Sequence, residues 1–320
     1  MAKAEQIKAL IRSHWSEDPE RFMTIALQVA AYEAQQGHRE LALEIRDLVD
    51  QAKRERHGKV VSALQPELEG LVQVEATDAR LGMLVLRGEL LERVQRIVHE
   101  YLQRHKLKKH GLMHRRKVLL TGPPGTGKTL TAKVLAHELR LPLMTVQVDK
   151  LASKYMGETG AKLRKVFELV ERRQAVYFFD EFDALGGGRT KDNDVGEMRR
   201  VLNALLQFIE QDRSDSLIVA ATNSPELLDK ALFRRFDDVL AYGLPTPEER
   251  RALVANTLGT FLPGRMAWAE VLKKSDGLSH AEVDLAVKDA IKEAILGDRH
   301  TVNTAMLLAA FEQRKRTPYR

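Results

Sequence analysis

A glycine-rich segment at residues 117–129, KVLLTGPPGTGKT, carries the residue types that bind a polyphosphate. Gly122 and Gly127 are followed by Lys128 and Thr129 in the spacing G-x-x-x-x-G-K-[ST], in which backbone N–H groups surround phosphate oxygens. In such a loop the lysine reaches the β- and γ-phosphates, and the threonine hydroxyl binds Mg²⁺. The segment therefore predicts a site for a nucleoside triphosphate and a magnesium ion.

Two adjacent carboxylates, Asp180 and Glu181, directly follow four apolar residues at 176–179. Such an uninterrupted apolar run is typical of a strand buried on both faces of a parallel sheet, and ligands gather at the carboxyl ends of these strands. Asp180 can hold Mg²⁺ through water, and Glu181 can accept the proton of an attacking water. Beside a phosphate loop, this pair predicts phosphoryl transfer to water rather than to a hydroxyl substrate.

Three more polar residues are candidates for the same chemistry. Asn223 follows another apolar run, at 217–221. It can orient the attacking water or sense the γ-phosphate, although an asparagine at a strand end is more often a turn residue. Arg234 and Arg235 are adjacent between apolar residues. Two neighbouring arginines are costly to bury unpaired and suit a phosphate that another subunit supplies.

These residues need strands that end at one edge and a helix that begins at the phosphate loop. The apolar residues 118–120 predict the strand before the loop, and 130–139 have the periodicity of a helix. The apolar runs at 143–148, 176–179 and 217–221 predict further strands, and a helix is expected at 197–211. Strands that alternate with helices indicate an α/β fold with a parallel sheet.

Helical patterns flank this α/β body on both sides. Residues 1–56 predict two or three short helices, which bury little apolar surface alone. Their apolar stripes either complete a core or dock on a partner. Near the other end, Thr246 with Glu249 and Ser279 with Glu282 form the S/T-x-x-E pattern of a capping box, which predicts the start of two helices.

Composition limits the class of protein. A chain of 320 residues exceeds the usual size of one domain, and 44% hydrophobic residues suffice for a buried core. There is no cysteine, which excludes disulfides and thiolate chemistry in this sequence. No signal-peptide core or bilayer-length apolar run occurs, so a cytoplasmic location is expected.

The charge balance permits, but does not require, an acidic partner such as nucleic acid. The net charge is +6 and the isoelectric point is near 9.4. Residues 104–117 form a basic run with interleaved histidines, for which nucleic-acid contact is one interpretation. We favour a solvated face between a helix and a buried strand, because no stacking aromatic accompanies the run.

The segments GPPGTGKT, FFDEFDAL, AATN and LDKALFRRFD occur in this order within residues 80–296, and they resemble AAA-type members of the AAA+ ATPases. The resemblance implies an α/β P-loop body with a C-terminal helical lid and a small N-terminal helical domain. It also implies a homo-oligomeric ring, usually a hexamer, with ATP at the subunit interfaces. The expected domains are 1–56 (N-terminal helices), 57–79 (linker), 80–244 (ATPase) and 245–320 (lid).

The same resemblance assigns a role to each candidate residue. Asp180 joins Thr129 at Mg²⁺, Glu181 activates water, and Asn223 senses the γ-phosphate. Arg234 and Arg235 become arginine fingers that act in the neighbouring subunit's site. The implied ATP-binding residues are Gly122, Pro123, Pro124, Gly125, Thr126, Gly127, Lys128, Thr129, Leu130 and Asp180.

Tyr155, Met156 and Gly157 place an aromatic residue and an apolar neighbour beside a flexible point. From composition alone, burial of the tyrosine is an alternative. The resemblance makes these residues the first pore loop, which grips an extended polypeptide threaded through the ring. An ATP-driven motor that remodels or unfolds proteins is therefore expected, and a DNA-acting loader or initiator is the alternative.

The sequence also departs from the family pattern. The two finger arginines lack the intervening Pro-Gly, so which one is the principal finger stays open. Residues 210–212 (Glu-Gln-Asp) replace an Asp-Gly-Phe element that signals between subunits in many relatives. His280 replaces a usual glycine, and we interpret it as an exposed second residue of its helix without a catalytic role.

Within the family, the short helical N-terminus, GETGAKLRKVF and FRRFD resemble a group of bacterial single-ring ATPases. Some members are encoded beside a subtilisin-like serine protease in anti-phage or plasmid-maintenance systems. A separate serine protease is therefore an expected partner, with phage defence as the expected context.

Overall fold

The structure is a computed structural model that describes residues 8, 19–49, 68, 70–151, 156–182, 192–228 and 230–316. The chain divides into two compact units, Met1–Glu67 and Leu68–Arg320. Each unit is described below by itself.

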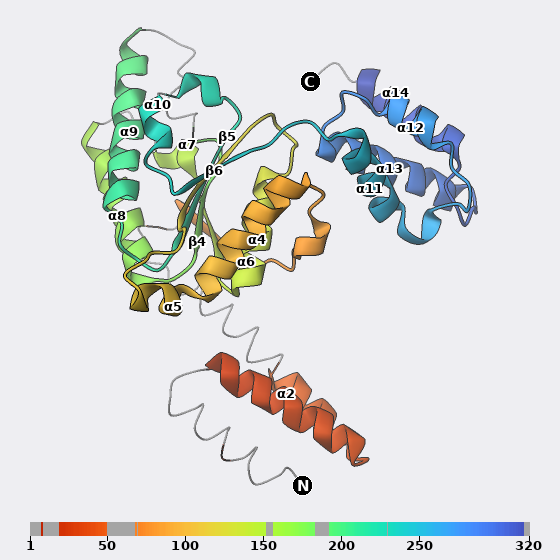
Figure 1. The fold of residues 1–320 in the computed structure, drawn as a ribbon, viewed down its shortest axis with the longest axis horizontal. Coiled ribbons are helices and arrows are strands. Elements are labelled where there is room, and N and C mark those ends of the chain that lie inside the picture. The colour runs from red at the N-terminus through yellow and green to blue at the C-terminus, as the bar shows by residue number, and fades with distance from the viewer. Residues whose placement is uncertain are drawn as a thin grey trace. The chain divides into compact units, whose positions relative to one another are not determined.

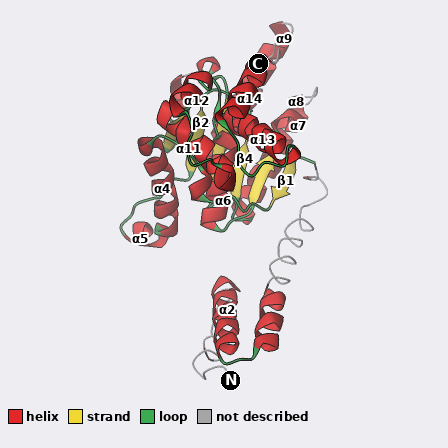
Figure 2. Cartoon of the chain, turned by 90° about the vertical axis from the view of Figure 1, so that its right-hand side faces the viewer, coloured by secondary structure: helices red, strands yellow, loops and turns green. Residues whose placement is uncertain are grey.

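The described part of the first unit is a pair of helices. Helix α2 (Pro19–Gln35) and a helix over 39–49 are joined by a turn in which Gly37 has a φ of +89°. Figure 2 shows the two helices side by side, and Ala26 and Val49 are buried between them. Large apolar side chains on the helix over 39–49 remain exposed, among them Leu48, which is 65% exposed. These two helices therefore bury only part of the apolar stripe that the sequence shows.

The second unit contains a six-stranded sheet in the order β1-β3-β4-β5-β2-β6. Strand β1 pairs antiparallel with β3, and the other neighbouring strands are parallel, which confirms the predicted α/β class. The strands are β1 (Val72–Glu75), β2 (Lys117–Thr121), β3 (Leu143–Val146), β4 (Val176–Phe179), β5 (Leu217–Thr222) and β6 (Asp238–Ala241).

Helices cover both faces of this sheet. Figure 1 shows α4 and α6 on one face and α8 and α9 on the other. The helices of the α/β part are α4 (Gly88–Leu102), α5 (Arg104–Lys109), α6 (Lys128–Leu139), α7 (Val148–Leu151), α8 (Met156–Arg172), α9 (Asp192–Gln211) and α10 (Lys230–Phe233), with short 3₁₀ turns at Leu81–Met83 and Pro225–Leu227. Strands β2, β4 and β5 are buried along their whole length, as expected for parallel strands between two helical layers.

The C-terminal helices form a bundle with a core of their own. They are α11 (Pro247–Leu258), α12 (Trp268–Lys274), α13 (His280–Leu296) and α14 (Thr304–Arg316), with a 3₁₀ turn at Gly259–Phe261. Side chains such as Val254, Val287 and Phe311 pack together inside the bundle. Both predicted capping boxes are confirmed, one at Thr246 and one at Ser279. These caps satisfy N–H groups that would otherwise lack partners at the two helix starts.

Several element boundaries differ from the sequence expectation. Strand β3 ends at Val146 rather than at residue 148, because a short helix begins there. Helix α9 begins at Asp192, upstream of the expected start. Strand β1 lies inside the range 57–79, which was expected to be a linker, and it adds an edge strand to β3. None of the described helices combines the length and apolar character needed to cross a bilayer.

The end of the basic run is largely buried, so its interpretation as a solvated face was wrong for His114, Arg116 and Lys117. His114, Arg116 and Lys117 are 2%, 5% and 6% exposed. The His114 ring packs edge-on against Tyr101, with 5.2 Å between ring centroids, and burial lowers the pKa of this histidine. Arg116 forms a buried ion pair with Asp212 at 2.6 Å. An acidic residue distant in the sequence neutralises this part of the run, which no local pattern shows.

Candidate active site

The sheet topology brings the candidate residues to one edge. Strand β5 lies between β4 and β2, and all three run parallel. Asp180 and Glu181 follow β4, Asn223 follows β5, and the loop 122–127 follows β2. Because parallel strands have their carboxyl ends at the same edge, these three segments meet there.

The phosphate loop has a backbone conformation that requires glycine at its start. Gly122 has a φ of +135°, and a Cβ atom at this position would overlap the carbonyl oxygen of Tyr242. Tyr242 directly follows β6, the strand that pairs with β2 on the side away from β5. Gly127 has a φ of +100° and immediately precedes α6. The first N–H groups of this twelve-residue helix therefore point toward the loop. A phosphate bound in the loop would accept hydrogen bonds from these groups, which have no partner within the helix.

Lys128 is held against the phosphate loop. Its Nζ donates hydrogen bonds to the carbonyl oxygens of Gly122 at 2.7 Å and Pro123 at 2.8 Å. Thr126 is fully buried, and its hydroxyl donates to the Pro123 carbonyl at 2.8 Å. The ammonium group thus lies over the loop that would enclose the phosphates, whereas Pro123, Pro124 and Gly125 are exposed.

The two proposed magnesium ligands are in contact. The Thr129 hydroxyl donates to Asp180 Oδ2 at 3.1 Å, and Asp180 Oδ1 accepts from the Glu181 N–H at 3.0 Å. Mg²⁺ favours a site with one or two protein oxygen ligands and leaves its other positions to water and phosphate. The hydroxyl and carboxylate oxygens of this pair fit that requirement.

Glu181 has an unusual backbone conformation and a specific side-chain partner. Its φ is +49°, in the left-handed region that non-glycine residues rarely adopt. Its exposed carboxylate accepts a hydrogen bond from Asn223 Nδ2 at 3.1 Å. Conformations of this kind are costly and cluster at functional sites. The carboxylate of Glu181 thus contacts the side-chain amide of the residue that follows the neighbouring strand β5.

The two arginines lie in the turn that follows α10, and they differ in their surroundings. Arg234 is exposed, whereas Arg235 is partly buried. Arg235 Nη1 lies 3.4 Å from Glu210 Oε2 at the end of α9. Among the described contacts, neither arginine reaches Lys128, Asp180 or Glu181 of its own chain.

The expected pore loop is only partly within the described residues. Tyr155 lies outside them, and Met156 and Gly157 are the first two residues of α8. The assignment of these three residues therefore stays a prediction. Leu130, the third residue of α6, is partly buried against the core of the α/β part.

The start of α13 contacts the phosphate loop, which the sequence did not indicate. The Ala281 N–H donates to the Gly125 carbonyl at 2.9 Å, and a Cβ atom on Gly125 would come within 2.7 Å of Ser279 Oγ. His280 is the first residue of this helix, not the second, and its ring nitrogens are shielded from solvent. Burial lowers its pKa, so the interpretation of His280 as exposed was wrong.

A phosphate loop, a carboxylate pair and an asparagine at one edge of a parallel sheet define a P-loop nucleoside triphosphatase. Residues 118–244 match the model of the "ATPase family associated with various cellular activities (AAA)". An AAA family ATPase of Sinorhizobium fredii is 34% identical over 316 residues, which cover 94% of this chain and 92% of the relative. The chain belongs to the AAA family, and it is an ATPase.

Other relatives are longer than the region that they share with this chain. A proteasome-activating nucleotidase of Methanothermobacter thermautotrophicus is 33% identical over 261 residues, which cover 79% of this chain and 64% of the relative. An ATP-dependent zinc metalloprotease FtsH of Mycoplasmopsis synoviae is 29% identical over 255 residues, which cover 77% of this chain and 38% of the relative.

Proposed function

We propose that the chain cleaves ATP at the edge formed by β2, β4 and β5. Lys128 binds the β- and γ-phosphates, and the backbone of the loop 122–127 encloses them. Thr129 and Asp180 hold Mg²⁺, which neutralises negative charge on the phosphates when it is bound. Glu181 takes a proton from the attacking water, and Asn223 orients this carboxylate or senses the γ-phosphate.

The observation that carries this proposal is a pair of cross-strand contacts. The Thr129–Asp180 contact joins the phosphate loop to the end of β4, and the Asn223–Glu181 contact joins the end of β5 to the same segment. Residues that are 51 and 42 positions apart in the sequence are thus within hydrogen-bond distance. Convergence of these groups supports one catalytic centre.

We further propose that the ATPase works as a homo-oligomeric ring, with a hexamer as the expected form. The finger arginines contact none of the described catalytic residues of their own chain, while family resemblance assigns them to phosphate. A neighbouring copy would bring an arginine to each site and complete the charge stabilisation there.

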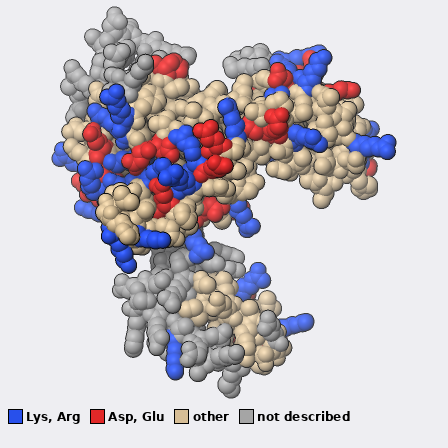
Figure 3. Space-filling view, in the orientation of Figure 1, with Lys and Arg blue, Asp and Glu red and all other residues tan. Residues whose placement is uncertain are grey.

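A protein is the proposed substrate of this ring. Two relatives are named for the activation of a proteasome and for ATP-dependent proteolysis, which supports a role in protein unfolding. Control of a separate serine protease in phage defence is the finer proposal, and it rests on the motif resemblance alone. In the DNA-acting alternative, the basic run would form the contact, but the end of this run is buried and its Arg116 is paired with Asp212. On the face seen in Figure 3, acidic and basic side chains are interspersed rather than gathered by sign.

Replacement of the pore-loop tyrosine tests the choice of substrate. Tyr155→Ala should retain most ATP hydrolysis and lose unfolding of a protein substrate, because the aromatic grip is separate from the nucleotide site. ATP turnover measures the first effect. The loss of fluorescence from a folded reporter protein, as the ring unfolds it, measures the second. Tyr155→Phe is the matched control. Stimulation of turnover by DNA, together with normal unfolding by Tyr155→Ala, would instead support the DNA-acting alternative.

A further inference from the structure

The two adjacent arginines in the turn after α10 differ in their exposure and in their ion-pair contacts. Arg234 is exposed, and no described side chain forms an ion pair with it. Arg235 turns back to its own chain, where its guanidinium lies 3.4 Å from the carboxylate of Glu210.

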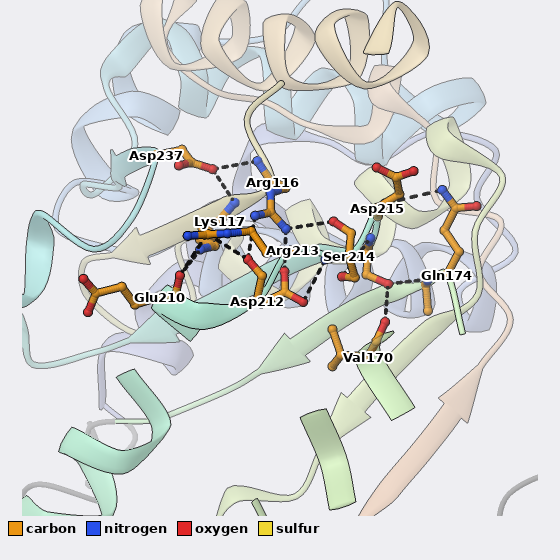
Figure 4. A network of polar contacts seen from close by, with 12 residues as sticks. Arg116, Lys117, Val170, Gln174, Glu210, Asp212, Arg213, Ser214, Asp215 and Asp237 are labelled. Atoms are coloured by element: carbon orange, nitrogen blue, oxygen red, sulfur yellow. Dashed lines mark hydrogen bonds and ion pairs between the residues drawn. The ribbon is translucent and has the colours of Figure 1, made fainter. Parts of the chain in front are cut away.

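The end of α9, which carries Glu210, is fixed to the start of β2. Lys117 Nζ donates to the Glu210 carbonyl at 3.0 Å. Arg116 donates to the Asp212 carboxylate and to the Asp212 carbonyl, both at 2.6 Å. Figure 4 shows these contacts converging on residues 116–117. The Arg116–Asp212 pair is nearly completely buried, so loss of either partner would leave an unpaired buried charge.

The segment after the arginines is fixed to the same two residues, Arg116 and Lys117, at the start of β2. One carboxylate oxygen of Asp237 accepts from the backbone N–H groups of Arg116 at 2.9 Å and Lys117 at 3.0 Å. The Asp237 N–H in turn donates to the Lys117 carbonyl at 2.8 Å. Phe236 is buried beside this anchor. The backbone of the turn and the end of α9 thus share one support, which keeps Glu210 within reach of Arg235.

We propose that the two arginines divide the work: Arg234 is the catalytic finger that reaches the neighbouring subunit's ATP, and Arg235 is a positioning residue that Glu210 retains in its own chain. This inference rests on the proposed ring. Arg235 would have to leave its carboxylate partner to reach a neighbour, whereas Arg234 leaves no partner among the described residues. The sequence alone left open which arginine is the principal finger, and the contact between Arg235 and Glu210 favours Arg234.

Single substitutions separate the two roles. Arg234→Ala should lower ATP turnover by about 10³-fold, the effect expected for loss of an arginine finger. Arg235→Ala and Glu210→Gln should each lower turnover by only about two- to five-fold, because an exposed ion pair contributes little. Glu210→Gln keeps the backbone carbonyl that accepts from Lys117, so the support itself remains. The exposed Glu226→Gln, on a neighbouring turn, is the matched control and should behave as wild type.

The double variant tests whether Glu210 acts through Arg235. Turnover of Glu210→Gln/Arg235→Ala should equal that of the lower single variant, because both changes remove the same contact. Exchange of the two charges, in Glu210→Arg/Arg235→Glu, should recover turnover relative to Arg235→Glu alone. Multiplied losses in the double variant, without recovery by the exchange, would overturn the positioning role.

Mixed assemblies distinguish failure of this inference from failure of the ring. Lys128→Ala chains carry both arginines but have an impaired site of their own, so mixing them with Arg234→Ala chains should restore turnover. An equally large loss in Arg235→Ala, also restored by mixing, would leave the ring intact and overturn the division of roles. Full activity of Arg234→Ala and Arg235→Ala, each measured alone, would overturn the ring proposal itself.

Discussion

Glu181→Gln should stop ATP hydrolysis while ATP stays bound. The glutamine has the shape of the glutamate, and its carbonyl oxygen can still accept from Asn223 Nδ2, which lies 3.1 Å from the native carboxylate. It cannot take the proton of an attacking water. Loss of a general base typically lowers the rate by about 10²- to 10⁴-fold. Phosphate release measures the rate, and analysis of the nucleotide in the isolated protein shows whether ATP is retained.

The exposed Glu248→Gln, at the start of α11, is the control for this experiment. It makes the same chemical change away from the sheet edge and should hydrolyse ATP at the wild-type rate. Hydrolysis by Glu181→Gln at the wild-type rate would remove Glu181 as the base. Loss of bound ATP in this variant would instead assign the carboxylate to nucleotide binding.

Lys128→Ala should lose affinity for ATP. In the structure the ammonium group lies on the phosphate loop, bonded to the carbonyls of Gly122 and Pro123, and its side chain is largely buried. Charge-assisted hydrogen bonds contribute about 1.5–3 kcal/mol each, so removal of this cation should weaken binding by about 10- to 100-fold. Calorimetric titration with ATP measures the change.

Lys133→Ala is the matched control, because Lys133 lies on the same helix and pairs with Glu75 at 2.7 Å instead of contacting the loop. Its ATP affinity should equal that of the wild type. The unfolding temperature of Lys128→Ala shows whether the phosphate loop still folds. Wild-type affinity in a folded Lys128→Ala protein would show that the loop does not bind phosphate through this residue.

The parts of the fold that depend on local pattern were predictable from the sequence. Strand β4 occupies the expected residues 176–179. An unbroken apolar run is stable as a strand that is buried on both faces, between two helical layers. The capping boxes at Thr246 and Ser279 depend on side chains three residues apart and were equally readable. The order of motifs along the chain gave the family.

The parts that depend on contacts distant in sequence were not predictable. Arg116 appeared to be one more residue of a solvated basic run, because its partner Asp212 is 96 positions away. His280 appeared exposed, because the pattern of its own helix does not show that the helix start meets Gly125. The same limit applied to Arg235, whose partner Glu210 lies on another helix. In these three cases the environment of a charged or polar residue is set by tertiary packing rather than by local sequence.

The dependence of turnover on protein concentration tests the central claim most directly. If the edge residues Lys128, Asp180 and Glu181 bind ATP but need Arg234 from another copy, turnover per chain should rise steeply with concentration and level off once assembly is complete. Light scattering on the same samples should show that the rise coincides with oligomer formation. Constant turnover per chain, down to dilutions at which the protein is monomeric, would contradict the account.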